Sequence, residues 1–295
     1  MSLYVYHSNP AIVAPDQNRV LTGLAREDLF TVVHERFLTD TARYADIVLP
    51  ATTSLEHSDI YRSYGHYNIQ AGRQVIDPVG EAKSNWDVFG LLAAGMGMND
   101  PFFSHSADDI IDQMVANAGL ALDEEAHQAL AAGRAVKLTL PDDYKLQFIT
   151  PSGKIEIFNP REEDPLPLYN KPYGDDEPLW LINSPDSRLL NSSFNERDDL
   201  TGSNQKLLLM NSADATDRGL EEGGHVVAYN QRGAVAFVLH ITDRVPPGVV
   251  VAEGVWSIEN SLGDRSVNAL TAQRLTDKGK GSTFYDAKVN VRAAD

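Results

Sequence analysis

The sequence predicts a chain of two parts, a partial α/β domain followed by a closed β-barrel. Up to about residue 140, short apolar runs alternate with stretches of helical spacing, as expected around a mostly parallel sheet. Beyond that point, short strand-like runs follow one another with Pro, Gly, Asn and Asp turns between them and little helix, which favours a barrel. We expect the two parts at residues 1–148 and 149–295.

The first part is expected to alternate strands and helices. Apolar, partly β-branched runs predict strands at 4–6, 29–33 and 46–50, with about one turn of helix at 39–44. Ser84 and Asp87 form a capping-box pattern. Apolar residues at helical spacing follow this cap: Trp86, Phe89, Leu92, Ala93 and Met96. Two further helices are predicted, one starting at 106 and one at 123–132 that stops at Gly133.

The second part is expected to consist mainly of strands. They are predicted at 154–158, 179–182, 207–210, 225–229, 234–240 and 249–252, with a hairpin turn at 230–233 and one short helix at 214–219. The Pro-rich, acidic stretch 159–178 is the expected linker between the parts.

Composition excludes several classes of function. The chain of 295 residues has 42 acids against 25 bases, a net charge of −17, so a nucleic-acid-binding surface is not expected. It has no cysteine, which excludes disulfides, thiolate zinc sites, cysteine nucleophiles and iron–sulfur ligation within these residues. We also find no apolar run long enough to span a membrane.

No catalytic or metal-ligating residue can be assigned from motifs. The eight histidines lack metal-ligand spacing, no GxSxG elbow is present, and residues 279–283 lack the pattern of a phosphate loop. The polar loop 184–193 is more informative, because it follows an expected strand and places Arg188 among hydroxyl and amide groups. From the residues alone, a ligand-binding loop and an ordinary solvated loop are equally good interpretations.

Several segments together resemble the dimethyl sulfoxide reductase family of molybdopterin oxidoreductases, in order and over nearly the whole chain. They are Asn9-Pro10, TARYADIVLPA at 41–51, Glu56, TPSGKIE at 150–156, the DA-containing segment 210–219, GGHVVAYNQRG at 223–233, VPPGVV at 245–250 and VNALT at 267–271. The resemblance implies that the second part is a double-psi β-barrel. It also implies a bis(molybdopterin guanine dinucleotide) cofactor carrying molybdenum or tungsten.

The resemblance further implies which residues contact that cofactor. In the first part they are Asn9, His34, Glu35 and Asn85; in the second they are Ser184, Arg188, Asn191, Ser192, Ser193, Asn268 and Tyr285, with Asp286 as an alternative to Tyr285. The metal ligand and any iron–sulfur segment of the family lie upstream of the matched region. We therefore expect a cofactor-holding fragment that is inactive by itself.

The implied partners follow from this assignment. They are the cofactor, a missing N-terminal half of the same polypeptide and electron-transfer subunits. The compartment, cytoplasmic or periplasmic, is left open. Two alternatives remain: a structural homologue that keeps the fold without binding cofactor, and an unrelated sugar-binding or hydrolytic barrel.

Overall fold

A computed structural model of the chain describes residues 1–117, 122–201 and 206–294. Contacts divide the chain into two compact units. Unit 1 combines residues 1–48 with 168–295, and unit 2 comprises residues 49–167. The predicted boundary at 148/149 separates two consecutive parts of the sequence. Because unit 1 is discontinuous, the two units do not correspond to those two parts, and the boundary stays a prediction. None of the helices in the described ranges is long and apolar enough to cross a membrane.

The N-terminal segment of unit 1 forms a small sheet with two helices. Strand β1 (Ser2–Tyr6) pairs in parallel with β2 (Phe30–Glu35), and β3 (Ile47–Pro50) completes the order β1-β2-β3. Helices α1 (Pro10–Val13) and α2 (Gln17–Leu24) connect β1 to β2. The predicted turn at 39–44 is present as a 3₁₀ helix, η1 (Ala42–Tyr44).

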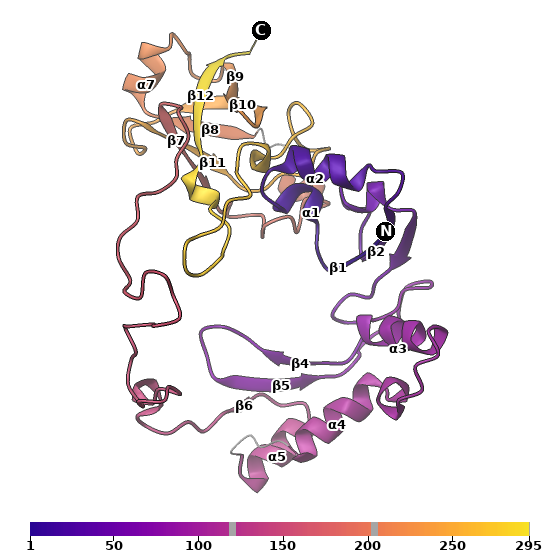
Figure 1. Cartoon of the computed structure of the whole chain (residues 1–295). Coiled ribbons are helices and arrows are strands. Elements are labelled where there is room, and N and C mark those ends of the chain that lie inside the picture. Colours follow the sequence, from indigo (N-terminus) through magenta and orange to yellow (C-terminus); the bar gives the residue numbers. More distant parts are fainter. Residues whose placement is uncertain (118–121, 202–205, 295) are drawn as a thin grey trace. The chain divides into compact units, whose positions relative to one another are not determined.

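Six strands close into a barrel within the described part of unit 1 (Figure 1). They are β7 (Leu179–Ser184), β8 (Leu207–Met210), β9 (His225–Asn230), β10 (Gly233–Ile241), β11 (Val249–Glu253) and β12 (Lys288–Ala293). Their order around the barrel is β10-β8-β11-β7-β12-β9, with β10–β8 and β11–β7 as parallel pairs. The short helices α6 (Asp198–Thr201) and α7 (Ser212–Asp217) and the 3₁₀ turns η4 (Val267–Ala269) and η5 (Phe284–Asp286) lie in the connections.

Alternation of side chains explains why these strands close around one core. In β10, Val235, Phe237 and Leu239 are buried at every second position, and the same period recurs in the other five strands. The prediction of a closed barrel in the second part of the chain is therefore confirmed.

Unit 2 has an open sheet instead. Strands β4 (Asp59–Arg62), β5 (Asn68–Gly72) and β6 (Val136–Lys137) are antiparallel, and α4 (Ala107–Asn117) and α5 (Glu124–Ala131) pack on them (Figure 1). Helix α3 (Asn85–Gly95) begins at the predicted cap, where Ser84 Oγ accepts a hydrogen bond from the amide of Asp87. The 3₁₀ turns η2 (Pro101–Ser104) and η3 (Tyr144–Leu146) complete the unit.

One predicted strand is wrong. Residues 154–158 have no regular structure, and Ile155, Ile157 and Phe158 are exposed. Apolar alternation favours a strand only where a neighbouring strand accepts its backbone hydrogen bonds, and the structure pairs no strand with this segment in its described part.

Candidate functional site

The carboxyl ends of β1 and β2 lie at one edge of the N-terminal sheet. These parallel strands are in register from Ser2–Phe30 to Tyr6–His34, so Asn9 and the His34-Glu35 pair leave the sheet on the same side. Such an edge is where ligands bind in α/β folds. His34 is fully buried, and Glu35 accepts a hydrogen bond at Oε1 from the amide of Arg36, at 2.8 Å.

The amide of Asn9 organises the loop that follows β2. Its Oδ1 accepts hydrogen bonds from the backbone amide of Thr41 at 3.1 Å and from Thr41 Oγ1 at 2.7 Å. Its Nδ2 donates to Asp40 Oδ2 at 3.1 Å. Asn9, Asp40 and Thr41 are all buried, so these bonds hold the loop in one conformation.

Asp40 connects this sheet edge to the barrel. Its other oxygen, Oδ1, accepts a hydrogen bond from the backbone amide of Ile258 at 2.7 Å. Ile258 belongs to the segment that follows β11, and Asp40 and Ile258 lie in the same unit. The end of the α/β segment is thereby fixed to the connection after β11, 218 residues later in the sequence.

The polar loop predicted at 184–193 follows β7, which ends at Ser184. Arg188 forms a bidentate pair with Asp186, with Nε–Oδ1 at 2.9 Å and Nη2–Oδ2 at 2.7 Å, and lies 5.9 Å from the centre of the Trp256 ring. Its hydrogen bonds hold the pKa of Asp186 below the usual value and raise the pKa of Arg188. The Arg188 side chain is 37% exposed, so its guanidinium is both oriented and accessible.

Asn195, which the sequence analysis did not single out, joins this loop to the segment after β11. Its Nδ2 donates to the carbonyls of Ser192 (3.2 Å) and Val255 (3.0 Å), and its Oδ1 accepts from the amide of Ser257 at 2.9 Å. Nothing local distinguishes Asn195 from other amides of the loop, because Val255 and Ser257, its two partners outside the loop, lie 60 and 62 residues away.

The sheet edge, the loop and the segment after β11 enclose a cavity of about 290 Å³. Two predicted cofactor contacts, Asn9 and Ser192, line it together. The other lining residues are Phe37, Leu38, Thr39, Asp40, Arg43, Asn195, Glu196, Asp198, Ser257, Glu259 and Asn260. We call this cavity the interface cavity, because both segments of unit 1 contribute to it.

The charges of the interface cavity favour a ligand with hydrogen-bond donors. Its lining has four carboxylates, from Asp40, Glu196, Asp198 and Glu259, and one arginine. That arginine, Arg43, pairs with Glu259 at 2.6 Å. Carboxylates accept strong hydrogen bonds from N–H groups, such as those on the edge of a guanine base, and repel phosphate.

The structure places other predicted contacts elsewhere. Asn268 is buried and donates from Nδ2 to the carbonyl of Ile12 at 2.8 Å, while its Oδ1 accepts from Thr271 at 3.1 Å. Asn85 is the first residue of α3 in unit 2, and Tyr285 is exposed on η5. Ser184, Asn191 and Ser193 belong to the polar loop but do not line the interface cavity. All of these assignments stay predictions.

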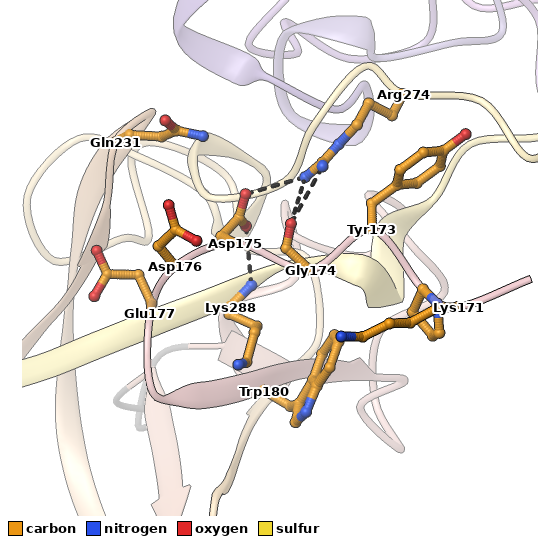
Figure 2. A pocket seen from close by; sticks show the side chains of 11 residues that line it. Lys171, Tyr173, Gly174, Asp175, Asp176, Glu177, Trp180, Gln231, Arg274 and Lys288 are labelled. Carbon is orange, nitrogen blue, oxygen red and sulfur yellow. Dashed lines mark hydrogen bonds and ion pairs between the residues drawn. The ribbon is translucent and has the colours of Figure 1, made fainter.

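A second cavity, of about 530 Å³, lies at the opposite end of β7 (Figure 2). At its base, the buried Asp175 accepts hydrogen bonds from Arg232 and Arg274. Burial raises the pKa of Asp175, but the bonds from Arg232 and from the Lys288 amide outweigh it and lower the pKa overall. None of the predicted cofactor contacts lines this cavity, and Arg274, the arginine in its lining, already has a partner in Asp175.

Comparison with known proteins identifies two matched regions. Residues 1–94 match a family model described as molybdopterin oxidoreductase, and residues 179–288 match one described as "Molydopterin dinucleotide binding domain". Both matches confirm the resemblance predicted from the sequence.

Individual relatives are longer than this chain. It is 39% identical to the probable oxidoreductase YoaE of Bacillus subtilis, over 98% of this chain and 44% of that protein. It is 29% identical to a dimethyl sulfoxide/trimethylamine N-oxide reductase of Rhodobacter capsulatus, over 86% of this chain and 35% of the reductase. The chain thus spans less than half the length of these relatives.

A solved structure shares the fold. The acetylene hydratase of Pelobacter acetylenicus superimposes with a TM-score of 0.83 at 21% sequence identity, covering 99% of this chain and 44% of the hydratase.

Proposed function

We propose, from the premise that this chain is a member of the molybdopterin oxidoreductase family, that it holds the guanine dinucleotide end of a bis(molybdopterin guanine dinucleotide) cofactor within a larger oxidoreductase. The observation that carries this proposal is the interface cavity. It lies between segments that belong to the two matched regions, and it brings Asn9 and Ser192 together from positions 183 residues apart in the sequence.

The residues present fit such a ligand by their chemistry. Carboxylates of the interface cavity can accept hydrogen bonds from a guanine edge, and the Ser192 hydroxyl can bind a ribose hydroxyl. The oriented guanidinium of Arg188 supplies a positive charge for a phosphate. It can bind the phosphate in place of Asp186 or together with it. When bound, the metal of the cofactor would supply two-electron or oxygen-transfer chemistry; the roles of these residues are binding and orientation.

Several finer points belong to the same proposal. The two parallel strand pairs within a six-stranded barrel support a double-psi crossover. Molybdenum is the proposed metal, with tungsten as the alternative, and an iron–sulfur cluster would lie in polypeptide outside these 295 residues. The division at 148/149, an N-terminal half of the same polypeptide and electron-transfer subunits are likewise proposals. The alternative of a homologue without cofactor gains no support from the comparisons.

The test uses the protein encoded by the complete gene, as purified. We expect guanine nucleotide to be released on acid treatment, together with stoichiometric molybdenum or tungsten measured by mass spectrometry. Ser192→Leu, which fills the interface cavity without removing the Ser192 carbonyl that Asn195 uses, is expected to reduce guanine content to roughly a third or less. Arg26→Ala, at an exposed pair with Asp28, is the matched control. A wild-type protein with neither guanine nor metal contradicts the proposal.

A further inference from the structure

The cavity at the end of β7 opposite the polar loop is the larger of the two described above, and the proposed function does not use it. Its volume of about 530 Å³ is in the range of small-molecule sites. The consecutive residues 171–177 supply most of its lining, and the half-buried Trp180 adds an aromatic surface. All lining residues belong to unit 1. We call it the β7 cavity.

Hydrogen bonds hold the middle of the stretch 171–177 in place. The carbonyl of Gly174 accepts from Arg274 at 3.2 Å. The side chain of Asp175 is buried and accepts from Arg232, Arg274 and the amide of Lys288. This part of the wall is therefore ordered in the protein itself, and a ligand would not have to order it on binding.

Four charged side chains of the β7 cavity have no partner of opposite charge in the described part of the chain. The carboxylates of Asp176 and Glu177 and the ammonium of Lys171 form no hydrogen bond or ion pair there. The ammonium of Lys288 has no carboxylate partner and lies 5.0 Å from the centre of the Trp180 ring. Figure 2 shows Asp176 and Glu177 towards one end of the view and Lys171 towards the other. The lining thus offers two positive and two negative charges that do not neutralise one another.

We propose that the β7 cavity binds a small zwitterion with an apolar body, of which a dipeptide with free termini is a simple example. An anion would be repelled by Asp176 and Glu177, and a cation by the two lysines, so a ligand of one sign is disfavoured. A zwitterion can place its carboxylate at the lysines and its ammonium at the acids. Its apolar side chain then packs on Trp180.

The separation of the charges favours a ligand whose own charges are well separated. Neither lysine of the cavity forms an ion pair with Asp176 or Glu177, so the protein leaves a gap between its opposite charges. The two termini of a dipeptide lie far enough apart to reach across such a gap, and its side chain supplies the apolar body.

Ligand-observed NMR tests the proposal with three matched probes. They are the dipeptide Gly-Phe, its N-acetyl derivative, which lacks the positive charge, and its C-terminal amide, which lacks the negative charge. Each is titrated into the protein encoded by the complete gene at pH 6.5, where the peptide amine is protonated. We expect Gly-Phe to bind about fivefold more tightly than either derivative, as partly exposed ion pairs allow.

Two variants assign the charges to their ends of the cavity. Lys171→Met should weaken the binding of Gly-Phe and of the N-acetyl derivative about twofold or more, without weakening that of the amide. Glu177→Gln should weaken Gly-Phe and the amide to the same extent, without weakening the N-acetyl derivative. Lys154→Met and Glu27→Gln, at exposed positions outside the cavity, are the matched controls. Far-UV circular dichroism of each variant checks that the fold is retained.

Three outcomes would overturn the proposal. One is that Gly-Phe does not bind to the complete protein, and another is that the three probes bind equally well. The third is that Lys154→Met weakens Gly-Phe as much as Lys171→Met does, because the attraction would then be nonspecific. None of these outcomes bears on guanine binding in the interface cavity, so this proposal and the proposed function can fail separately.

Discussion

The barrel of unit 1 and the open sheet of unit 2 bury their apolar side chains to very different extents. In the barrel, all six strands contribute to one cluster in which Phe237, Leu208 and Val250 are fully buried. In unit 2, the cluster under the β4–β5–β6 sheet is small and does not include α3. A closed barrel completes its own hydrogen bonds and core, whereas an open sheet with one covered side depends on its surroundings. The comparison teaches that the barrel completes a large core of its own, whereas the open sheet of unit 2 rests on a small one.

The largest expected effect is the loss of an aromatic ring from the barrel core. Phe237→Ala is expected to destabilise unit 1 by about 3–5 kcal/mol, because it removes a fully buried ring and leaves a cavity. Leu91→Ala in α3, where the side chain is 59% exposed, is expected to change stability by roughly 0.5 kcal/mol or less in the same chain. Urea unfolding measures both effects. The fluorescence of Trp180 and Trp256 follows the unfolding of unit 1, and that of Trp86 follows the unfolding of unit 2. Equal effects would remove the distinction between the units.

Asp175→Asn should have the next largest effect. The substitution removes the carboxylate that holds Arg232 and Arg274, leaving both cations without this partner, at a cost of about 3 kcal/mol. Folding lowers the pKa of Asp175 from its unfolded value of 3.8. The contribution of Asp175 to the free energy of unfolding is therefore complete above pH 3.8 and is lost as the pH falls through the lower pKa of the folded state. Acid unfolding of the wild type and the variant should therefore converge at low pH. A variant as stable as the wild type at pH 7 would contradict this account.

Lys206→Met should stabilise the barrel. The ammonium of Lys206 is buried, donates to the carbonyl of Arg265 at 2.7 Å and lies 4.8 Å from the centre of the Phe237 ring. Burial lowers the pKa of Lys206 from 10.5 to about 7. The unfolded chain therefore binds one more proton between pH 7 and 10.5, and wild-type stability rises with pH across that window.

The variant has no such titration. We expect it to be more stable than the wild type by about 2 kcal/mol at or below pH 7, less than the whole pKa shift implies because the Arg265 carbonyl loses its donor. The difference should shrink towards pH 10. Denaturant midpoints at pH 6, 8 and 10 measure it, and a constant difference would exclude titration of Lys206 as the cause.

The smallest expected effect concerns the cap of α3. Ser84→Ala removes the hydrogen bond to the amide of Asp87 and should cost about 1 kcal/mol, confined to unit 2. Ser84→Asp, which keeps an acceptor, is the matched control. Hydrogen exchange of the first turn of α3, compared with β10 amides, should register the change in unit 2 alone. Faster exchange in β10 would show that the two units unfold together.

Much of the secondary structure follows from local patterns. Strand-like runs between Pro, Gly, Asn and Asp turns predicted β7, β8, β9, β10 and β11, and the capping pairs predicted the starts of α3 and α4. The strands β4, β5 and β12 and the helices α1 and α2 were not predicted. Helix α1 spans four residues and α2 eight, and both are too short for a clear helical period. Strand β5, which runs from Asn68 to Gly72, has an ordinary polarity that does not identify it as a strand.

The sequence by itself predicted the family resemblance and the barrel, because motifs, strand-like runs and turn residues are local properties of the sequence. Only the tertiary structure decided that the edge of the first sheet and the loop after β7 share a cavity. It also decided that the amides of Asn9 and Asn268, both predicted to contact the cofactor, hydrogen-bond within the protein. The physical reason is separation: Asn268 finds the carbonyl of Ile12 256 residues away, and no local period encodes such a contact.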